Sequence, residues 1–217
     1  SRELMNLLAV DTAGRTCSAA LVTDGRIRAA LFADFDQTHA RHLMKLINAV
    51  MQLAGTQIAD MDGFGVTVGP GSFTGLRIGL STIKGFASAW GKPVAGITTF
   101  SALAHPVTMD AGLLCPVIDA RKGEVYAEVY RVGQEGRIPV WPAQACPPEA
   151  VAEKLRELEE PCCFVGSGAV LYRELLLRKL GGRARFAPDA ANHIRAGTVG
   201  ELAYPVIHRG RGQSAAD

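Results

Sequence analysis

Asn6-Leu7-Leu8-Ala9-Val10-Asp11 and Cys115-Pro116-Val117-Ile118-Asp119 share one pattern, although they lie far apart in the chain. Each is a short apolar run that ends in an aspartate, as expected for a buried strand whose last residue reaches the edge of a sheet. A second strand-like stretch follows each run: Cys17 stands six residues past Asp11, and Val125 stands six residues past Asp119. This recurrence predicts two structural repeats.

Working outward from these runs, the sequence alternates strand and helix patterns. In the first half we expect strands at 6–11, 17–22, 27–32, 63–68 and 94–97, with helices from Thr38 to Gly55 and over 76–90. In the second half we expect strands at 115–119, 124–130, 137–141 and 162–166, with helices over 148–159, 170–180 and 192–203. The fold class is therefore α/β with duplicated lobes, each a mixed β-sheet with flanking helices. We place the first lobe at residues 1–100, with 192–217 returning to it, and the second at 101–191.

Composition sets the broad class of protein. The chain has 217 residues, of which 48% are hydrophobic and 20% charged, with a formal net charge of +2. This excludes disordered and fibrous proteins, and no apolar run approaches the roughly 20 residues of a membrane span. Five cysteines without a C-x-x-C pair predict neither a disulfide framework nor a zinc knuckle. We expect a cytoplasmic protein.

Asp11 and Asp119 occupy the places where actin-like and sugar-kinase proteins hold Mg²⁺ and nucleotide phosphates. A phosphate cradle also needs small residues, so that the hairpin backbone can approach the phosphate. The expected pattern is Asp-x-Gly, but the third residue here is Ala13, and Ala120-Arg121-Lys122 follows Asp119. Gly166-Ser167-Gly168 is only a weak match to the glycine-rich loop that binds adenosine in these proteins. We therefore expect a degenerate cleft whose aspartates bond loop amides, the alternative being that they are metal ligands.

A glycine-rich string joins the strand at 63–68 to the following helix. It fits neither a dinucleotide fingerprint nor a Walker loop, because Thr74 stands where a glycine is needed and no Gly-Lys is present. We interpret it as a rigid corner in which Thr74 caps the helix. Its structural residues are Gly69, Pro70, Gly71, Ser72, Thr74, Gly75 and Arg77.

Two groups of residues invite a functional interpretation that we do not favour. His39 and His42 are three residues apart on the first helix, but no third metal ligand accompanies them, so we predict no metal site. Residues 173–211 contain eight Lys or Arg against three Asp or Glu. This stretch is either solvated surface, which we favour because few aromatic residues are interleaved, or an RNA contact. No catalytic residue is predicted.

Small residues in the second helix predict a partner surface. Glycine inside a helix costs about 1 kcal/mol relative to alanine, so Gly79 and Gly85 indicate close approach by another backbone. Methionines on the first helix widen its apolar stripe and suit an adaptable surface. The interface residues that we predict are Met44, Ile47, Met51, Gly79, Ile83, Gly85 and Trp90.

Four strings together resemble the TsaB family, also called YeaZ. They are Leu8-Ala9-Val10-Asp11-Thr12-Ala13 with Cys17-Ser18-Ala19-Ala20, the string Gly69 to Gly79, Thr98 to Ala104, and Asp119 to Tyr126. The string Gly69 to Gly79 is the most specific. The resemblance covers roughly residues 7 to 130 well and the remainder loosely.

The resemblance implies a function in bacterial tRNA modification. TsaB is a non-catalytic paralogue of TsaD, the subunit that transfers threonylcarbamoyl to the adenosine beside the anticodon. The family implies an actin-like fold, pairing with a TsaD-like subunit through the two helices of the first lobe, and a TsaE-like ATPase. It also implies a homodimer when the chain is isolated, and tRNA bound through the complex. TsaD carries an H-x-x-x-H metal motif, whereas His39-Ala40-Arg41-His42 has the wrong spacing.

Two hypotheses follow. The first is a non-enzymatic scaffold subunit with no cofactor of its own, ATP and Mg²⁺ being handled by partner subunits. The second is an ATP-dependent small-molecule kinase or metallo-enzyme that uses Asp11 and Asp119. Binding of a magnesium nucleotide separates the two.

Overall fold

The computed structural model describes residues 4–34 and 40–215. It divides into two compact units: unit 1 comprises Ser1–Ala102 with Ile194–Asp217, and unit 2 comprises Leu103–His193. The sequence placed the boundary near residue 100 and the return to the first lobe at residue 192. Within the described residues, no helix is both long enough and apolar enough to cross a membrane.

Unit 1 is built on a five-stranded mixed sheet in the order β3-β2-β1-β4-β5. Its strands are β1 (Asn6–Asp11), β2 (Thr16–Thr23), β3 (Arg26–Asp34), β4 (Gly63–Gly69) and β5 (Val94–Thr98). The first three form an antiparallel meander, whereas β4 and β5 join parallel to β1. Asp24 and Gly25 make the predicted tight turn between β2 and β3, both with positive φ, of 48° and 75°.

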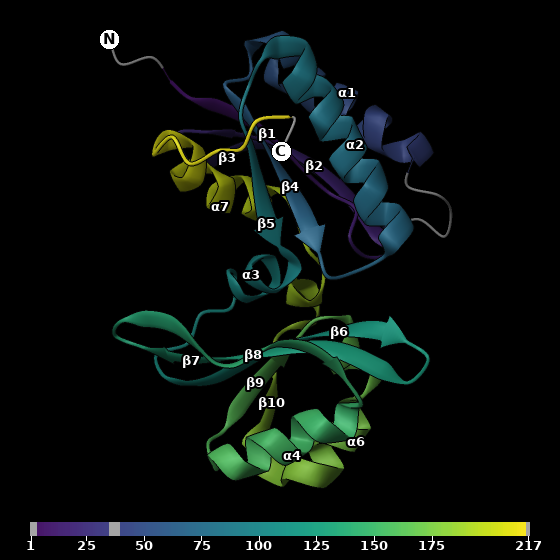
Figure 1. Cartoon of the computed structure of the whole chain (residues 1–217), viewed down its shortest axis with the longest axis vertical. Coiled ribbons are helices and arrows are strands. Elements are labelled where there is room, and N and C mark those ends of the chain that lie inside the picture. Colours follow the sequence, from purple (N-terminus) through teal and green to yellow (C-terminus); the bar gives the residue numbers. More distant parts are fainter. Residues whose placement is uncertain (1–3, 35–39, 216–217) are drawn as a thin grey trace. The chain divides into compact units, whose positions relative to one another are not determined.

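Helices cover both faces of this sheet (Figure 1). One face carries α1 (Ala40–Ala54) and α2 (Phe73–Trp90), and the other carries α7 (Ala196–His208). The predicted N-cap Thr38 lies outside the described residues. The buried core between α1, α2 and the sheet includes Leu8, Ile47, Phe64 and Ile83.

Unit 2 repeats this plan with the strand order β10-β9-β6-β7-β8. Its strands are β6 (Gly112–Arg121), β7 (Glu124–Gly133), β8 (Gly136–Cys146), β9 (Cys162–Val165) and β10 (Ala184–Phe186). Its helices α4 (Pro148–Leu158) and α6 (Arg173–Leu180) pack on one face, as Figure 1 shows. The antiparallel meander β6-β7-β8 and the parallel strands β9 and β10 match β1 to β5 one for one. The predicted duplication is confirmed.

Several boundaries differ from the sequence prediction. The helix expected over 170–180 is two helices, α5 (Ser167–Leu171) and α6, separated at Tyr172. The last helix begins at Ala196 instead of residue 192. The predicted elements lacked α3 (Thr99–Ala104) and β10, and also η1 (Ile58–Asp60), η2 (Gly181–Arg183) and η3 (Asp189–Asn192). All of these are short, so they carry too few residues to establish a period.

Glycines let α7 lie directly on the sheet. A Cβ added at Gly65 of β4 would lie 2.9 Å from the Ala203 Cβ, and one added at Gly200 would lie 2.4 Å from a Val22 methyl and 3.2 Å from the Ala9 Cβ. At Gly85 of α2 a Cβ would meet nothing within 4 Å. Gly200 of α7 is therefore tightly packed, whereas Gly85 of α2 faces open space.

We predict that Gly200→Val lowers the free energy of unfolding by about 1 to 3 kcal/mol, because the added atoms must push α7 off the sheet. The matched change Gly85→Ala should raise it by up to about 1 kcal/mol, because it only improves helix propensity. Urea unfolding followed by circular dichroism measures both. Equal effects at the two positions would contradict this packing.

Candidate functional site

Asp11 ends β1 inside unit 1 and is fully buried. Its Oδ1 accepts a hydrogen bond from the Thr67 hydroxyl of β4 and another, at 3.2 Å, from the Ala13 backbone amide. Its Oδ2 is buried and has no hydrogen-bond partner in the described part of the chain. Oδ1 of this carboxyl group therefore accepts two hydrogen bonds, whereas Oδ2 accepts none from the described residues.

Burial controls the protonation of Asp11. Loss of solvent raises the pKa of this carboxyl group from 3.8 to about 6, against the lowering effect of the bonds from Thr67, Ala13 and Thr12. The neighbouring thiol of Cys17 has its pKa raised to about 12 by burial and by Asp11, so it stays protonated at neutral pH. That thiol is a poor nucleophile.

The corner between β4 and α2 lies directly on the loop that follows Asp11. The Ser72 amide donates to the Ala13 carbonyl at 2.8 Å, and the Thr12 hydroxyl donates to the Gly75 carbonyl at 2.7 Å. A Cβ at Gly71 would lie 2.5 Å from the Ala13 oxygen, and one at Gly79 would lie 2.4 Å from the Thr12 hydroxyl oxygen. Gly71 is needed because backbone meets backbone there, and Gly79 because the Thr12 side chain packs against the helix, so α2 and its corner lie directly on the Asp11 loop.

The helix cap differs from the prediction. Ser72, not Thr74, caps α2, since its hydroxyl oxygen accepts a bond from the Gly75 amide at 3.2 Å. Thr74 is exposed one position into the helix. Arg77 is also exposed, with its guanidinium 5.3 Å from the centre of the Phe73 ring. Pro70 follows Gly69 through a cis peptide bond.

Asp119 shows the same local arrangement in unit 2. It is only partly buried, and its Oδ1 accepts from the Arg121 amide, two residues later, at 2.8 Å, just as Asp11 accepts from Ala13. The Asp119 amide donates to the Ser167 hydroxyl at 3.1 Å. Both aspartates thus bond loop amides, as expected from the sequence.

The stretch Gly166-Ser167-Gly168, which weakly resembles an adenosine-binding loop, forms a tightly packed corner between β9 and α5. A Cβ at Gly166 would lie 2.5 Å from the Val117 carbonyl oxygen, and one at Gly168 would lie 2.7 Å from a Val117 methyl. The corner between β9 and α5 therefore presses on β6 as the corner between β4 and α2 presses on the loop after β1. Neither corner leaves a glycine-lined space for a nucleotide within its own unit.

Metal ligands do not gather in the described residues, which contain no group of three or more His, Cys, Asp or Glu side chains. His42 lies half-buried on α1, and His39 lies outside the described residues.

The predicted interface residues separate into two sets. Met44, Gly85 and Trp90 are exposed. Ile47, Met51, Gly79 and Ile83 are buried in unit 1, so a partner cannot reach them and their assignment to an interface was wrong. The reason is that a helical period of apolar residues marks the face toward the protein's own core.

The exposed face of α2 is a better candidate for an interface than the buried apolar stripe. A shallow groove of about 420 Å³ runs along it, lined by Phe73, Thr74, Arg77, Ile78, Ser81 and Thr82. Phe73 is 73% exposed, and Gly85 continues the small-residue surface toward the helix end. Phe73, Ile78, Ser81 and Thr82 were not among the predicted interface residues, because apolar and polar side chains are mixed along this face.

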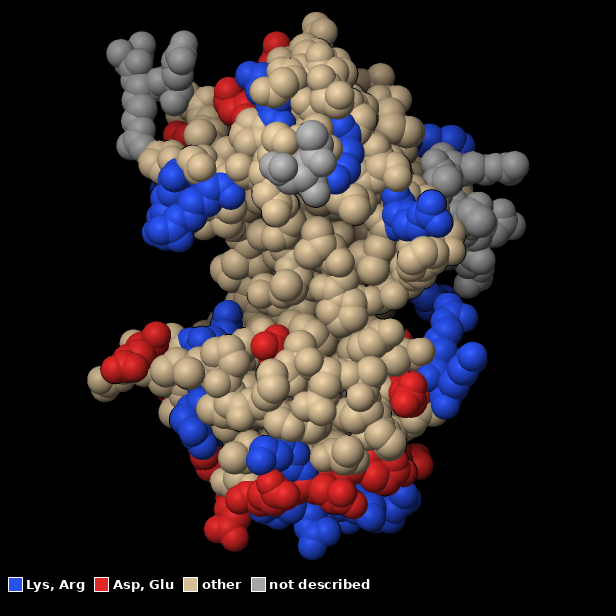
Figure 2. Space-filling model, in the orientation of Figure 1, with Lys and Arg blue, Asp and Glu red and all other residues tan. Residues whose placement is uncertain are grey.

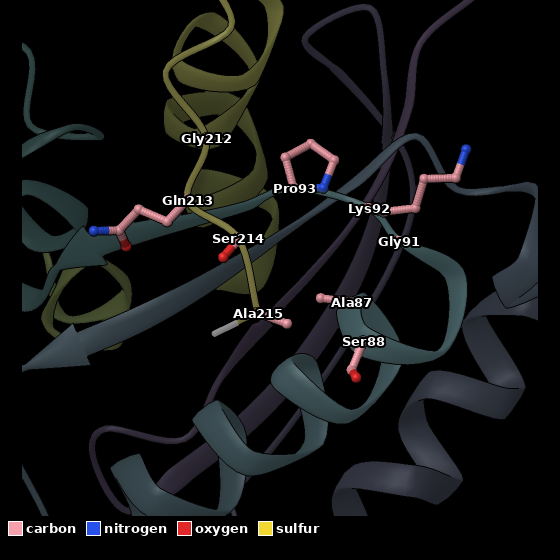
Figure 3. A pocket seen from close by; sticks show the side chains of 9 residues that line it. All are labelled: Ala87, Ser88, Gly91, Lys92, Pro93, Gly212, Gln213, Ser214 and Ala215. Atoms are coloured by element: carbon pink, nitrogen blue, oxygen red, sulfur yellow. The ribbon is translucent and has the colours of Figure 1, made fainter. Parts of the chain in front are cut away.

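A second hollow, of about 570 Å³, lies between the end of α2 and the C-terminal segment. That segment pairs with the edge strand β5 through reciprocal bonds between Val94 and Gln213, at 2.9 and 2.8 Å. Figure 3 shows the side chains of Lys92 and Gln213 pointing away from the hollow, which leaves mainly small side chains and backbone around it. Among the described residues that line it, Lys92 is the only charged one.

Two units of the same five-stranded plan, each with an aspartate at or near the end of its central strand, show the actin-like, sugar-kinase fold. A ROK hexokinase from Thermus thermophilus shares this fold, with a TM-score of 0.50 at 15% identity over 95% of this chain and all of that one. Residues 34–208 match the family model TsaD, described as tRNA N6-adenosine threonylcarbamoyltransferase.

More similar proteins identify the family to which this chain belongs. Over 177 residues the chain is 32% identical to the tRNA threonylcarbamoyladenosine biosynthesis protein TsaB of Escherichia coli, covering 79% of this chain and 75% of that protein. The structure of YeaZ from Pseudomonas aeruginosa matches with a TM-score of 0.78 and 26% identity, over 98% of this chain and 97% of that one. The chain belongs to the TsaB family, within the wider group that the TsaD model describes.

Asp11 should make stability depend on pH. Because its folded-state pKa is about 6 and its usual value 3.8, the folded protein binds the proton more tightly, and the free energy of unfolding should fall as pH rises from about 4 to about 6. The full effect corresponds to about 3 kcal/mol. Asp11→Asn, which cannot ionise, should flatten this slope.

Urea unfolding at several pH values between 4 and 7.5 measures the slope. An unchanged slope in Asp11→Asn would show that this carboxyl group is not the one that titrates.

Proposed function

We propose that this chain serves tRNA threonylcarbamoyladenosine biosynthesis as a non-catalytic subunit that pairs with a TsaD-type subunit. The observation that carries the proposal is the contact of the β4–α2 corner with the loop after Asp11. In it, the Ser72 amide donates to the Ala13 carbonyl and the Thr12 hydroxyl to the Gly75 carbonyl, so the Ser72 amide is not free to bind a phosphate. Family membership supports the pathway.

The exposed faces of α1 and α2 support pairing through unit 1. Gly85 has nothing within 4 Å of its Cβ position, so a facing helix has room to approach there. Met44 and Trp90 are 38% and 40% exposed and add apolar area beside it. Burying such side chains is worth roughly 1.5 to 3 kcal/mol each, and anchors of this kind usually dominate an interface. The same face would form a homodimer when the chain is alone.

In this proposal the chain needs no cofactor of its own. A TsaD-type subunit performs the transfer, a TsaE-like ATPase handles ATP and Mg²⁺, and tRNA is bound through the complex in the cytoplasm. The alternative is an ATP-dependent small-molecule kinase or metallo-enzyme that uses Asp11 and Asp119. The matching family model TsaD is described as a transferase, so an enzymatic function is also tested below.

Gly85→Leu tests the pairing face. Leucine is a better helix former and has open space at this position, so the melting temperature should not fall. Both homodimerisation and pairing with a TsaD-type subunit should be lost, as measured by sedimentation and co-purification. The control is Glu153→Leu on the exposed side of α4, which should pair normally. A Gly85→Leu protein that still pairs would refute this interface.

Titration calorimetry with Mg·ATP tests the absence of nucleotide chemistry. We expect weak binding by the isolated chain that is unaffected by Asp11→Asn, together with no ATP hydrolysis. A micromolar dissociation constant that Asp11→Asn abolishes would establish the alternative function instead.

A further inference from the structure

The basic stretch at 173–211 divides between two places in the structure. One part, on α6 and β10, lies in unit 2, whereas Arg195 and Arg209 flank α7 in unit 1. The β2–β3 hairpin packs along α7. Arg195 and Arg209 therefore lie near residues that are far from them in the sequence. A Cβ at Gly25 would lie 3.1 Å from the Tyr204 ring, and the Arg195 guanidinium lies 4.5 Å from the centre of the Phe32 ring.

We call the surface along these contacts the α7 flank. Its members are Arg28, Phe32, Arg195, Tyr204 and His208. Arg28 lies at the β3 bulge next to Ile27, whose side chain packs on α7, since a Cβ at Gly197 would lie 2.5 Å from it. The thirteen residues of α7 span about 20 Å, so the flank is long enough to contact several phosphates of one nucleic acid strand. Both arginines are exposed.

Exposed arginines outnumber exposed acidic groups along the α7 flank. Arg209 follows α7 and adds a third exposed arginine. Of the acidic groups alongside, Glu201 and Asp24 are half-buried, and the exposed Asp34 at the end of β3 pairs with Arg15 at 3.5 Å. The Asp24 Oδ1 accepts a hydrogen bond from the Met5 amide at 3.0 Å. Figure 2 shows Lys and Arg atoms on unit 1, and on unit 2 a row of Asp and Glu atoms with Lys and Arg atoms next to it.

Aromatic rings accompany these cations. The rings of Tyr204 and His208 lie 5.3 Å apart at an angle of 34°, and Phe32 lies under Arg195. A guanidinium held flat on a ring is already oriented, and proteins use such planes and rings to stack RNA bases. Exposed cations interleaved with rings are the combination that binds single-stranded nucleic acid.

We infer that the α7 flank binds RNA through its phosphate backbone. The inference rests on the proposed function, because RNA is then the molecule on which the complex acts. Phosphate contacts give affinity that depends on salt and carry no sequence information. The flank therefore holds and orients RNA, and recognition of the target base lies elsewhere.

The basic residues of unit 2 have a local explanation that the α7 flank lacks. Arg178 and Lys179 lie in the last turn of α6, where positive charge stabilises the helix dipole. The neighbouring helix α4 carries acidic side chains such as Glu153 and Glu157. This cluster therefore supplies a control of equal charge.

Fluorescence anisotropy of the full chain with a labelled, unmodified tRNA transcript tests the inference between about 50 and about 200 mM salt. The variant is Arg28→Glu with Arg195→Glu, and the control is Arg178→Glu with Lys179→Glu. We expect the flank variant to lose at least about tenfold in affinity and its slope of log Kd against log salt to fall by about 2, one for each phosphate contact removed. The control should change less than about twofold.

Three results would overturn the inference: no saturable binding by the parent chain at the lowest salt, an unchanged flank variant, or equal losses in both variants, which would show a response to net charge only. Melting temperatures verify that all variants fold. Co-purification with the TsaD-type subunit is measured on the same proteins. If pairing persists while the flank variant keeps its RNA affinity, only this inference fails, whereas loss of pairing by the parent chain would refute the proposed function.

Discussion

The backbone contact between two loops of unit 1 is the constraint on which the rest of that unit depends. The Ser72 amide and the Ala13 carbonyl meet at 2.8 Å, and this is possible only because Gly71 has no side chain to hold them apart. The contact fixes where α2 begins, and the Ser72 hydroxyl then caps that helix. Asp11, at the start of the same loop, is fully buried, and this burial raises the pKa of its carboxyl group.

Unit 2 meets the same constraint with different residues. Gly166 and Gly168 bring the β9–α5 corner onto Val117, and Ser167 bonds the Asp119 amide. The duplication therefore preserves the close approach of a glycine corner to the central strand. It does not preserve burial, because Asp119 is only partly buried while Asp11 is fully buried. Corresponding aspartates of the two repeats thus differ in electrostatics, which a comparison of strand patterns cannot reveal.

The sequence predicted the elements that have a period and missed properties that depend on contacts between distant residues. Alternation and apolar runs located nine of the ten strands that the described residues form, because burial imposes a period on them. The same period misled the interface assignment: Ile47 and Ile83 look like a free stripe until the sheet is known to cover it. The cap at Ser72 was missed because Ser72 and Thr74 are both good caps, and only the chain geometry chooses between them.

The two basic clusters show why position in the fold matters more than local composition. Basic residues at the end of α6 stabilise their own helix, so their presence needs no ligand. Arg28 comes from a strand and Arg195 from the start of a helix, 167 residues apart in the sequence, and the dipole of that helix disfavours positive charge at Arg195. Bringing like charges together costs folding energy unless a counter-charge arrives. The packing of the β2–β3 hairpin on α7 imposes this cost, and a polyanion bound along the flank would remove it.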